Sequence, residues 1–162
     1  MDNETIWTTK NPEIEYDTIW ITHSDIEPVR IYASNGSDQP VTIGGYSHDP
    51  CYIEVQYPQV DGESAPQASF SMQRAVVGDE VKRLLKSITP YKRITEPVKV
   101  VLARWHSSDL STPMFSYELD VANDGVSFSV DSVTVKCEKT NIMTRSVARV
   151  YEITEWTGLE NT

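Results

Sequence analysis

The chain has 162 residues, 39% of them hydrophobic, so it can bury one ordinary core and is short for two. Its formal net charge of −10 opposes binding to nucleic-acid phosphates, which depends on clustered Lys and Arg. No apolar run approaches the ~20 residues that cross a bilayer, and the N-terminus lacks a basic region followed by an apolar one, so we expect neither a membrane segment nor a secretory signal.

The first third of the chain predicts short β-strands joined by turns. Residues 18–22 and 28–34 are rich in β-forming side chains and flank a turn, and residues 41–43 follow a second turn. Residues 51–57 alternate apolar and polar side chains, with the period of two expected of a half-buried strand. We expect a flexible N-terminal segment over residues 1–16 and one β domain over residues 17–139.

One helix interrupts this β pattern. Val81, Leu84, Leu85 and Ile88 have the spacing i, i+3, i+4 and i+7, which forms a single apolar stripe on a helix. Acidic residues occupy the predicted first turn and basic residues the later turns, as the helix dipole favours, and Pro90 predicts the end. We expect a helix near residues 79–88 whose apolar stripe joins the core.

Strands return after the helix. Residues 96–105 contain the most apolar strand, residues 115–122 alternate, and the sequence Ala-Asn-Asp-Gly-Val-Ser at 122–127 predicts a hairpin turn. Apolar residues then change phase, from even numbers at 126–130 to odd numbers at 133–137, which predicts a bulge or bend near Asp131 and Ser132. Residues 140–162 have no clean period and are predicted to form a C-terminal arm.

This order of elements predicts a mainly β fold. About eight short strands with one packed α-helix fit a β-sandwich or half-open barrel in which the helix covers one edge or face.

Residues that could carry chemistry do not form a recognisable pattern. Cys51 and Cys137 fall on apolar strand faces and are predicted to be buried thiols, with a disulfide as the alternative. His48 lies near Cys51, as a Cys–His nucleophile would require, but Asp-Pro between them is typical of a turn. The three histidines lack the close spacing of metal ligands. We therefore expect neither an enzyme nor a cofactor or metal site.

Charge is unevenly distributed along the chain. Residues 1–65 contain twelve acidic and two basic residues, whereas the remaining residues are balanced. Basic residues cluster around the predicted helix. An acidic flank and a basic flank can favour self-association, and a solvated surface is the alternative. The hypothesis places an interface at Lys82, Arg83, Lys86 and Arg93.

Four segments of the chain, between about residues 17 and 137, resemble a family of unknown function encoded among the tail-tip genes of tailed bacteriophages. In that family a strand pair, an acidic strand, a helix and an apolar strand follow in this order. The helix and the strand from Pro97 to Arg104 match the last two elements; the spaced residues that match the first two are His23, Glu27, Pro28, Arg30, Asp61, Gly62, Pro66 and Ala68. The C-terminal arm departs from the family pattern.

The resemblance implies a structural subunit of the virion tail, with a fold similar to the tail tube. Such a subunit would form a ring or hub that joins the tube to the distal tip, after assembly in the host cytoplasm. Its expected partners are further copies of itself and the tube, hub and tape-measure proteins, while DNA would pass without being bound. The alternative is a carbohydrate- or receptor-binding β-sandwich of the tip, which would use exposed aromatic residues; the candidates are Trp7, Trp20, Trp105 and Trp156.

Overall fold

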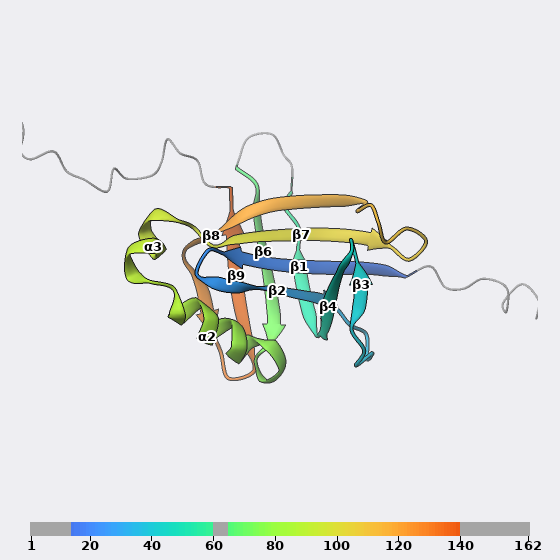
Figure 1. The fold of residues 1–162 in the computed structure, drawn as a ribbon, viewed down its shortest axis with the longest axis horizontal. Coiled ribbons are helices and arrows are strands. Elements are labelled where there is room, and N and C mark those ends of the chain that lie inside the picture. The colour runs from blue at the N-terminus through green and yellow to red at the C-terminus, as the bar shows by residue number, and fades with distance from the viewer. Residues whose placement is uncertain (1–13, 60–64, 140–162) are drawn as a thin grey trace, which may run out of the picture.

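A computed structural model describes residues 14–59 and 65–139, and these residues form a mainly β domain (Figure 1). The prediction of a β fold with a packed helix is confirmed, with nine strands among the described residues where about eight were expected. A π-helical turn, η1 (Arg74–Gly78), leads into helix α2 (Asp79–Ser87), and α3 (Pro90–Thr95) follows. The strands are β1 (Glu15–His23), β2 (Ile26–Ala33), β3 (Val41–Ile43), β4 (Tyr46–Cys51), β5 (Ile53–Gln56), β6 (Gln67–Gln73), β7 (Lys99–His106), β8 (Phe115–Phe128) and β9 (Ser132–Glu138).

The strands form two layers that cross steeply, with the core between them. In Figure 1 β1, β2 and β7 run along the longest axis, while β6 and β9 run across it. The strand order is β3-β4-β2-β1-β7-β8-β9-β6-β5, antiparallel except for the parallel pair β2 and β4. Side chains from both layers fill the core, including Ile19 and Leu102 from the first layer and Phe70 and Val135 from the second.

The two layers are connected on one side by β8 and on the other by the consecutive strands β4 and β5, which together close most of the barrel. The start of β8 pairs with β7, and its end pairs with β9. On the opposite side, β4 pairs with β2 and β5 pairs with β6, with only Tyr52 between β4 and β5. The sequence predicted residues 51–57 as one strand. The predicted period of two is present, since Cys51 and Ile53 are buried and Tyr52 and Glu54 are exposed. The pairing partner nevertheless changes at Tyr52.

The hairpin predicted at residues 122–127 is wrong, because β8 continues through them. The register between β8 and β9 shifts between Val121 and Val126, and Asp124 has a φ of 56°, so this segment is a bulge. The hairpin turn lies instead where a bend was predicted: the amide of Ser129 donates to the Ser132 carbonyl at 2.9 Å. A turn sequence and a bulge both require unusual backbone angles, so the local signal did not distinguish them.

Helix α2 closes the gap that the strands leave. Strand β4 pairs only with Ile31–Ala33, so among the described residues the first half of β2 has no strand on its outer edge. Val81 and Ile88 are buried in the core at 1% and 3% exposure, and Leu84 and Leu85 pack against it half-buried. The predicted apolar stripe is thus confirmed.

The helical segment extends beyond the predicted end. Helix α2 stops at Ser87, and Pro90 begins α3 instead of only ending α2. Proline lacks an amide hydrogen and has a φ suited to a helix, so it is accepted at the first helical position.

The N-terminal boundary also differs from the prediction. Glu15 and Tyr16 belong to β1, because they pair with His106 and Trp105 of β7, so they are part of the β domain and not of the flexible segment assigned to residues 1–16. Residues 1–13 and the predicted arm at 140–162 lie outside the described residues.

A second, smaller apolar cluster lies under the β3–β4 hairpin. Tyr32 and Ile43 are buried there, and Trp105 packs against the turn. Gly44 and Gly45 both have positive φ angles, as a two-residue hairpin turn of this type requires. A Cβ on Gly44 would lie 2.9 Å from the Trp105 ring, so this hairpin needs glycine for space as well as for backbone angle.

His48, buried at the base of this hairpin, should make stability depend on pH. Burial lowers its pKa, aided by the charge of Arg30 and opposed by the hydrogen bond from Nδ1 to the Tyr46 carbonyl at 3.0 Å. The unfolded chain gains this proton near pH 6.5 and the folded chain at a lower pH, so stability falls as pH drops below about 6.5.

We expect His48→Gln to reduce the loss of unfolding free energy between pH 7.5 and 5.5, measured by urea titration. An identical loss in the variant and the parent protein would contradict this role of His48.

Candidate interaction surface

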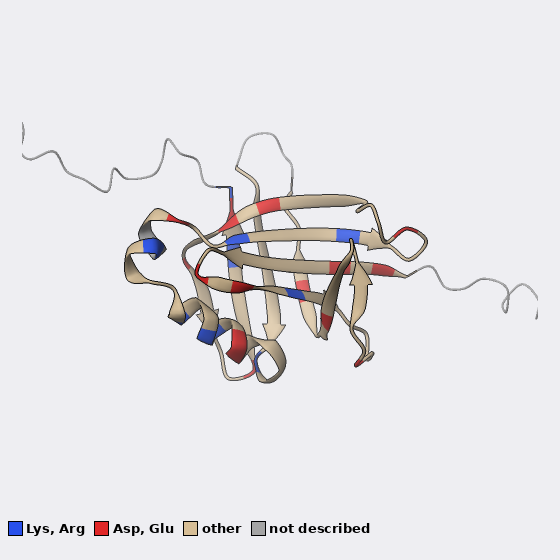
Figure 2. Ribbon diagram, viewed as in Figure 1, with Lys and Arg blue, Asp and Glu red and all other residues tan. Residues whose placement is uncertain are grey.

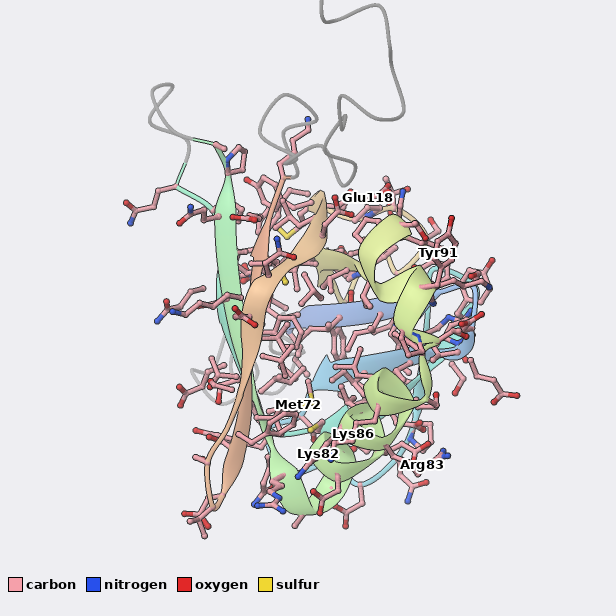
Figure 3. All side chains as sticks on the ribbon, turned by 90° about the vertical axis from the view of Figure 1, so that its left-hand side faces the viewer. Met72, Lys82, Arg83, Lys86, Tyr91 and Glu118 are labelled. Atoms are coloured by element: carbon pink, nitrogen blue, oxygen red, sulfur yellow. The ribbon has the colours of Figure 1, made fainter. Side chains whose placement is uncertain are left out.

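Helix α2 carries three of the four basic residues that the sequence singled out, Lys82, Arg83 and Lys86. Asp79 and Glu80 lie in its first turn and Lys86 in its last, which complements the helix dipole. Its apolar side faces the core, so Lys82, Arg83 and Lys86 emerge on the outward side, where Figure 3 shows them along one helix.

Two of these basic side chains have identified contacts within the domain. Lys82 places its Nζ 4.8 Å from the centre of the Phe128 ring, a cation–π arrangement. Arg83 donates two hydrogen bonds to Glu80, at 3.1 and 2.6 Å, and this pairing raises the pKa of Arg83 and lowers that of Glu80. Lys86 is exposed. Glu80 offsets the charge of Arg83. The exposed Lys86 and the partly exposed Lys82 are the residues of this row that we consider for contacts with another molecule.

Exposed apolar residues lie beside this basic row. Phe128 at the end of β8 is 43% exposed, and Val130 in the following turn is 85% exposed. The even phase of residues 126–130 predicted an inward-facing strand, but β8 ends at Phe128 and the turn carries Val130 outward. Val130 lies between Ser129 and Asp131, and serine and aspartate are common in turns, so the local composition favoured a turn although the period of two favoured a strand.

Arg74 joins the β8–β9 turn to the start of α2. Its amide donates to the Asp131 carbonyl at 2.9 Å, and its guanidinium donates to the Ser129 carbonyl at 3.3 Å and to Asp79 at 2.9 Å. The helix and the turn are therefore connected by hydrogen bonds. We call Lys82, Lys86, Phe128 and Val130 the basic surface.

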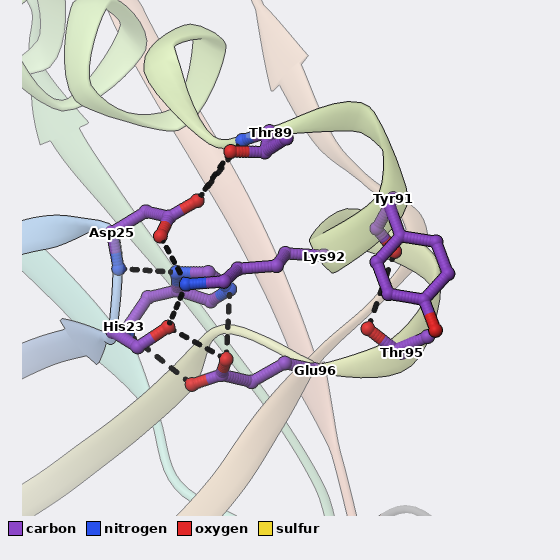
Figure 4. A network of polar contacts seen from close by, with 8 residues as sticks. His23, Asp25, Thr89, Tyr91, Lys92, Thr95 and Glu96 are labelled. Atoms are coloured by element: carbon purple, nitrogen blue, oxygen red, sulfur yellow. Dashed lines mark hydrogen bonds and ion pairs between the residues drawn. The ribbon is translucent and has the colours of Figure 1, made fainter.

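Arg93 is separated from the other predicted interface residues. It lies in α3, and its side chain is outside the described part of the structure. Polar contacts attach α3 to the β1–β2 turn (Figure 4). Lys92 pairs with Asp25, Thr89 donates to the same carboxylate at 2.8 Å, and Glu96 accepts from the Ser24 hydroxyl at 2.7 Å. The contact with Lys92, followed by that with Thr89, lowers the pKa of Asp25 to about 2.

His23, one of the residues that carry the phage resemblance, lies beneath α3. Its side chain is fully buried, its Nδ1 accepts the Asp25 amide at 3.0 Å, and its Nε2 has no hydrogen-bond partner among the described residues, 4.0 Å from a Glu96 oxygen. His23 therefore stabilises the β1–β2 turn, which α3 contacts.

The other residues of the resemblance that the structure describes lie in β2 and in or just before β6. Arg30 lies over Trp20 at 4.7 Å and Tyr46 at 4.5 Å, measured to the ring centres. Glu27 and Pro28 are exposed on the free edge of β2, and Ala68 is buried in β6. Pro66 is half-buried, whereas Asp61 and Gly62 lie outside the described residues. Those that are described thus occupy structural positions.

The residues considered for nucleophilic chemistry are buried. Cys51 and Cys137 are both free thiols, as the sequence predicted. Burial raises the pKa of Cys51, and it raises that of Cys137 to about 12, so both stay protonated near neutral pH. His48 directs its Nδ1 to the Tyr46 carbonyl.

Over residues 14–59 and 65–139, no group of three or more His, Cys, Asp or Glu side chains is placed to hold a metal ion. The helices within these residues are too short or too polar to span a membrane.

The acidic residues of the first half of the sequence that the structure describes do not gather on one side of the domain. Figure 2 shows acidic positions on β1, β2 and the turn between them, some of them near the helix. Glu27 and Asp49 line a cleft of about 650 Å³ together with Glu80 and Arg83 of α2. Strand β2 packs beside α2 in the fold, so charges that are separate in the sequence become neighbours.

No known family model matches this chain, and no curated protein matches it either. The described part of the chain presents an exposed surface that is apolar at the β8–β9 turn and basic along α2, on a domain held by a continuous sheet. Such a surface suits a protein–protein contact.

Proposed function

We propose that this chain is a structural subunit of a bacteriophage tail tip, which forms a ring or hub joining the tail tube to the distal tip. The observation that carries the proposal is the basic surface, in which the exposed Phe128 and Val130 adjoin Lys82 and Lys86. The resemblance in the order of strands, helix and matched residues supports the same assignment. The subunit would be assembled in the host cytoplasm and act in the virion tail.

The fold and the charge both suit such a subunit. Strand β8 pairs with both layers and helix α2 covers the unpaired part of β2, so the domain leaves little of its sheet edge open to unspecific pairing. A net charge of −10 would repel the DNA backbone, so DNA could pass a ring of these subunits without adhering. Further copies, together with the tube, hub and tape-measure proteins, are the proposed partners.

The carbohydrate- or receptor-binding alternative has less support. It requires exposed aromatic residues in a groove, but Trp105 packs against Gly44 and donates to Thr18 at 2.9 Å. Trp20 is covered by Arg30 and Tyr46. Trp7 and Trp156 lie outside the described residues. The two tryptophans that the structure describes therefore serve packing.

Reversing the charge of the basic surface should prevent assembly and leave the fold intact. We expect Lys82→Glu with Lys86→Glu to shift the protein to monomer in sedimentation velocity, because the new carboxylates would face acidic residues of a neighbouring copy. Exposed ion pairs contribute only about 0–1 kcal/mol each to folding, so the melting temperature should change little.

The matched control is Lys136→Glu with Lys139→Glu, which changes the charge equally on exposed residues of β9 and just beyond it. Two results would count against the basic surface: assembly that persists in the Lys82 and Lys86 variant, or assembly that is lost in this variant and equally in the control. The wider proposal is tested separately: absence of the protein from purified virions, together with a monomeric state at high concentration, would refute it.

A further inference from the structure

The domain has a second exposed surface, at the end of its longest axis away from the helices. There the start of β1 meets the loop between β7 and β8 (Figure 1). The amide of Ser107 donates to the Ile14 carbonyl at 2.8 Å, and the amide of Met114 donates to the Arg104 carbonyl at 2.8 Å. Ile14 is 45% exposed and Met114 55% exposed. Large apolar side chains are thus held in fixed positions at this end.

The charge around these apolar residues is acidic. Glu15 has a half-exposed carboxylate 3.3 Å from the Arg104 guanidinium, and Asp109 caps the loop by accepting from the amide of Ser111 at 2.9 Å. The hydrogen bonds from Ser111, and then Thr112, lower the pKa of Asp109, so it is ionised near neutral pH. We call Ile14, Glu15, Asp109 and Met114 the acidic surface; Figure 2 shows acidic positions on this end of β1 and on the loop.

A rigid cluster supports the acidic surface from inside the barrel. Arg104 donates two hydrogen bonds to Asp17, at 2.7 and 3.1 Å, and the hydroxyl of Tyr57 donates to the same carboxylate at 2.6 Å. The ring of Phe115 meets that of Tyr57 edge-on, with centres 4.9 Å apart. Asp17 offsets much of the charge of Arg104. The net charge of the acidic surface is therefore set by Glu15 and Asp109.

The two surfaces are complementary in charge and similar in composition. Each presents two exposed apolar side chains, with lysines beside them on the basic surface and carboxylates on the acidic surface. They lie toward opposite ends of the domain, so they cannot meet within one copy (Figure 1). Contact between copies would bury the apolar residues and bring opposite charges together, the arrangement that steers association.

We infer that the acidic surface of one copy binds the basic surface of the next, head to tail. This inference rests on the proposed self-assembly and names the surface that faces the lysines. A head-to-tail contact produces a closed ring if the rotation between copies closes, and an open filament if it does not. The partner at both ends is therefore a second copy of this chain.

A charge-swap experiment on the full-length protein tests the inference. One variant carries Lys82→Glu and Lys86→Glu, and the other carries Glu15→Lys and Asp109→Asn. Asparagine keeps an oxygen that can cap the loop, and Asp17 still holds Arg104, so we expect both variants to fold, as circular dichroism would verify. Alone, each should sediment as a monomer, because both of its ends then have the same sign of charge.

Mixing the two variants should restore assembly. The unchanged acidic surface of the first variant can bind the unchanged basic surface of the second. The two altered surfaces also have opposite charges, because the lysines of one became glutamates and Glu15 of the other became lysine. Sedimentation velocity in 50 mM and 500 mM salt would measure this, with assembly stronger at the lower salt because exposed charges are screened. A mixture that stays monomeric, or an acidic-surface variant that assembles alone, would overturn the pairing.

The apolar residues provide an independent test. We expect Met114→Asp to weaken assembly at least tenfold, whereas Tyr52→Asp should leave it unchanged, since Tyr52 is 63% exposed but lies outside both surfaces. Equal effects of the two changes would contradict the inference. Failure of these tests would leave the phage assignment open, because the presence of the chain in virions is measured independently.

Discussion

Replacing Ile88 by alanine should destabilise the domain by about 2–5 kcal/mol, the range for removing a large aliphatic side chain from a core. Ile88 is 3% exposed and follows the last turn of α2, where it contributes to the core that the helix closes. The resulting cavity would lie beside β2, whose first half has no neighbouring strand among the described residues. Urea unfolding followed by tryptophan fluorescence would measure the loss.

Two further substitutions test whether the loss of stability follows the burial of the replaced side chain. Leu84→Ala should cost less than Ile88→Ala, because Leu84 is only half-buried. Val130→Ala, at a residue 85% exposed, should stay within about 0.5 kcal/mol of the parent protein. If Ile88→Ala also cost less than 0.5 kcal/mol, the helix would not seal the barrel in the way described.

Gly125→Ala should destabilise the domain by about 3 kcal/mol, at the upper end of the usual range for overpacking. A Cβ on Gly125 would lie 2.7 Å from the Lys136 carbonyl oxygen and 2.8 Å from that of Ala122. Both atoms belong to the backbone, so neither can move aside by changing a side-chain rotamer. Gly125 lies in the bulge of β8, between Val121 and Val126, both of which pair with β9.

The control for this substitution is Gly45→Ala. Gly45 has a φ of 81° but nothing within 4 Å of an added Cβ, so the variant measures backbone strain without a clash, about 1 kcal/mol. Thermal unfolding of both variants would compare the two costs. A loss at Gly125 no larger than that at Gly45 would show that the bulge relaxes to admit a side chain.

The bulge at Gly125 also shows where local prediction failed. Asn-Asp-Gly favours positive φ, and such angles occur in hairpin turns and in bulges alike. Strand β8 passes straight through because β7 is available to pair with one part of it and β9 with the other. The choice between turn and bulge was therefore made by strands distant in the sequence.

The candidate surface was predictable only in part. The stripe of Val81 and Ile88 fixed which side of α2 faces inward, and hence that Lys82 and Lys86 face outward. Arg83 pairs with Glu80, three residues before it in the helix. This spacing is one at which helical side chains meet, but the sequence analysis did not predict the pair. Phe128 came beside Lys82 only through the packing of the β8–β9 turn against η1, which no sequence period encodes.

The sequence by itself determined the local features of this protein: the β-strands, the position of α2, the alternation at Cys51–Gln56 and the burial of both cysteines. These features depend on side chains a few residues apart, whose spacing matches the period of a strand or a helix. The tertiary structure decided which strands cross between layers, where the turn after β8 lies, and that Glu27 of β2 lies beside Glu80 and Arg83 of α2. Those outcomes depend on contacts between distant segments, because a strand finds its partner by burying a shared face and not by its own composition.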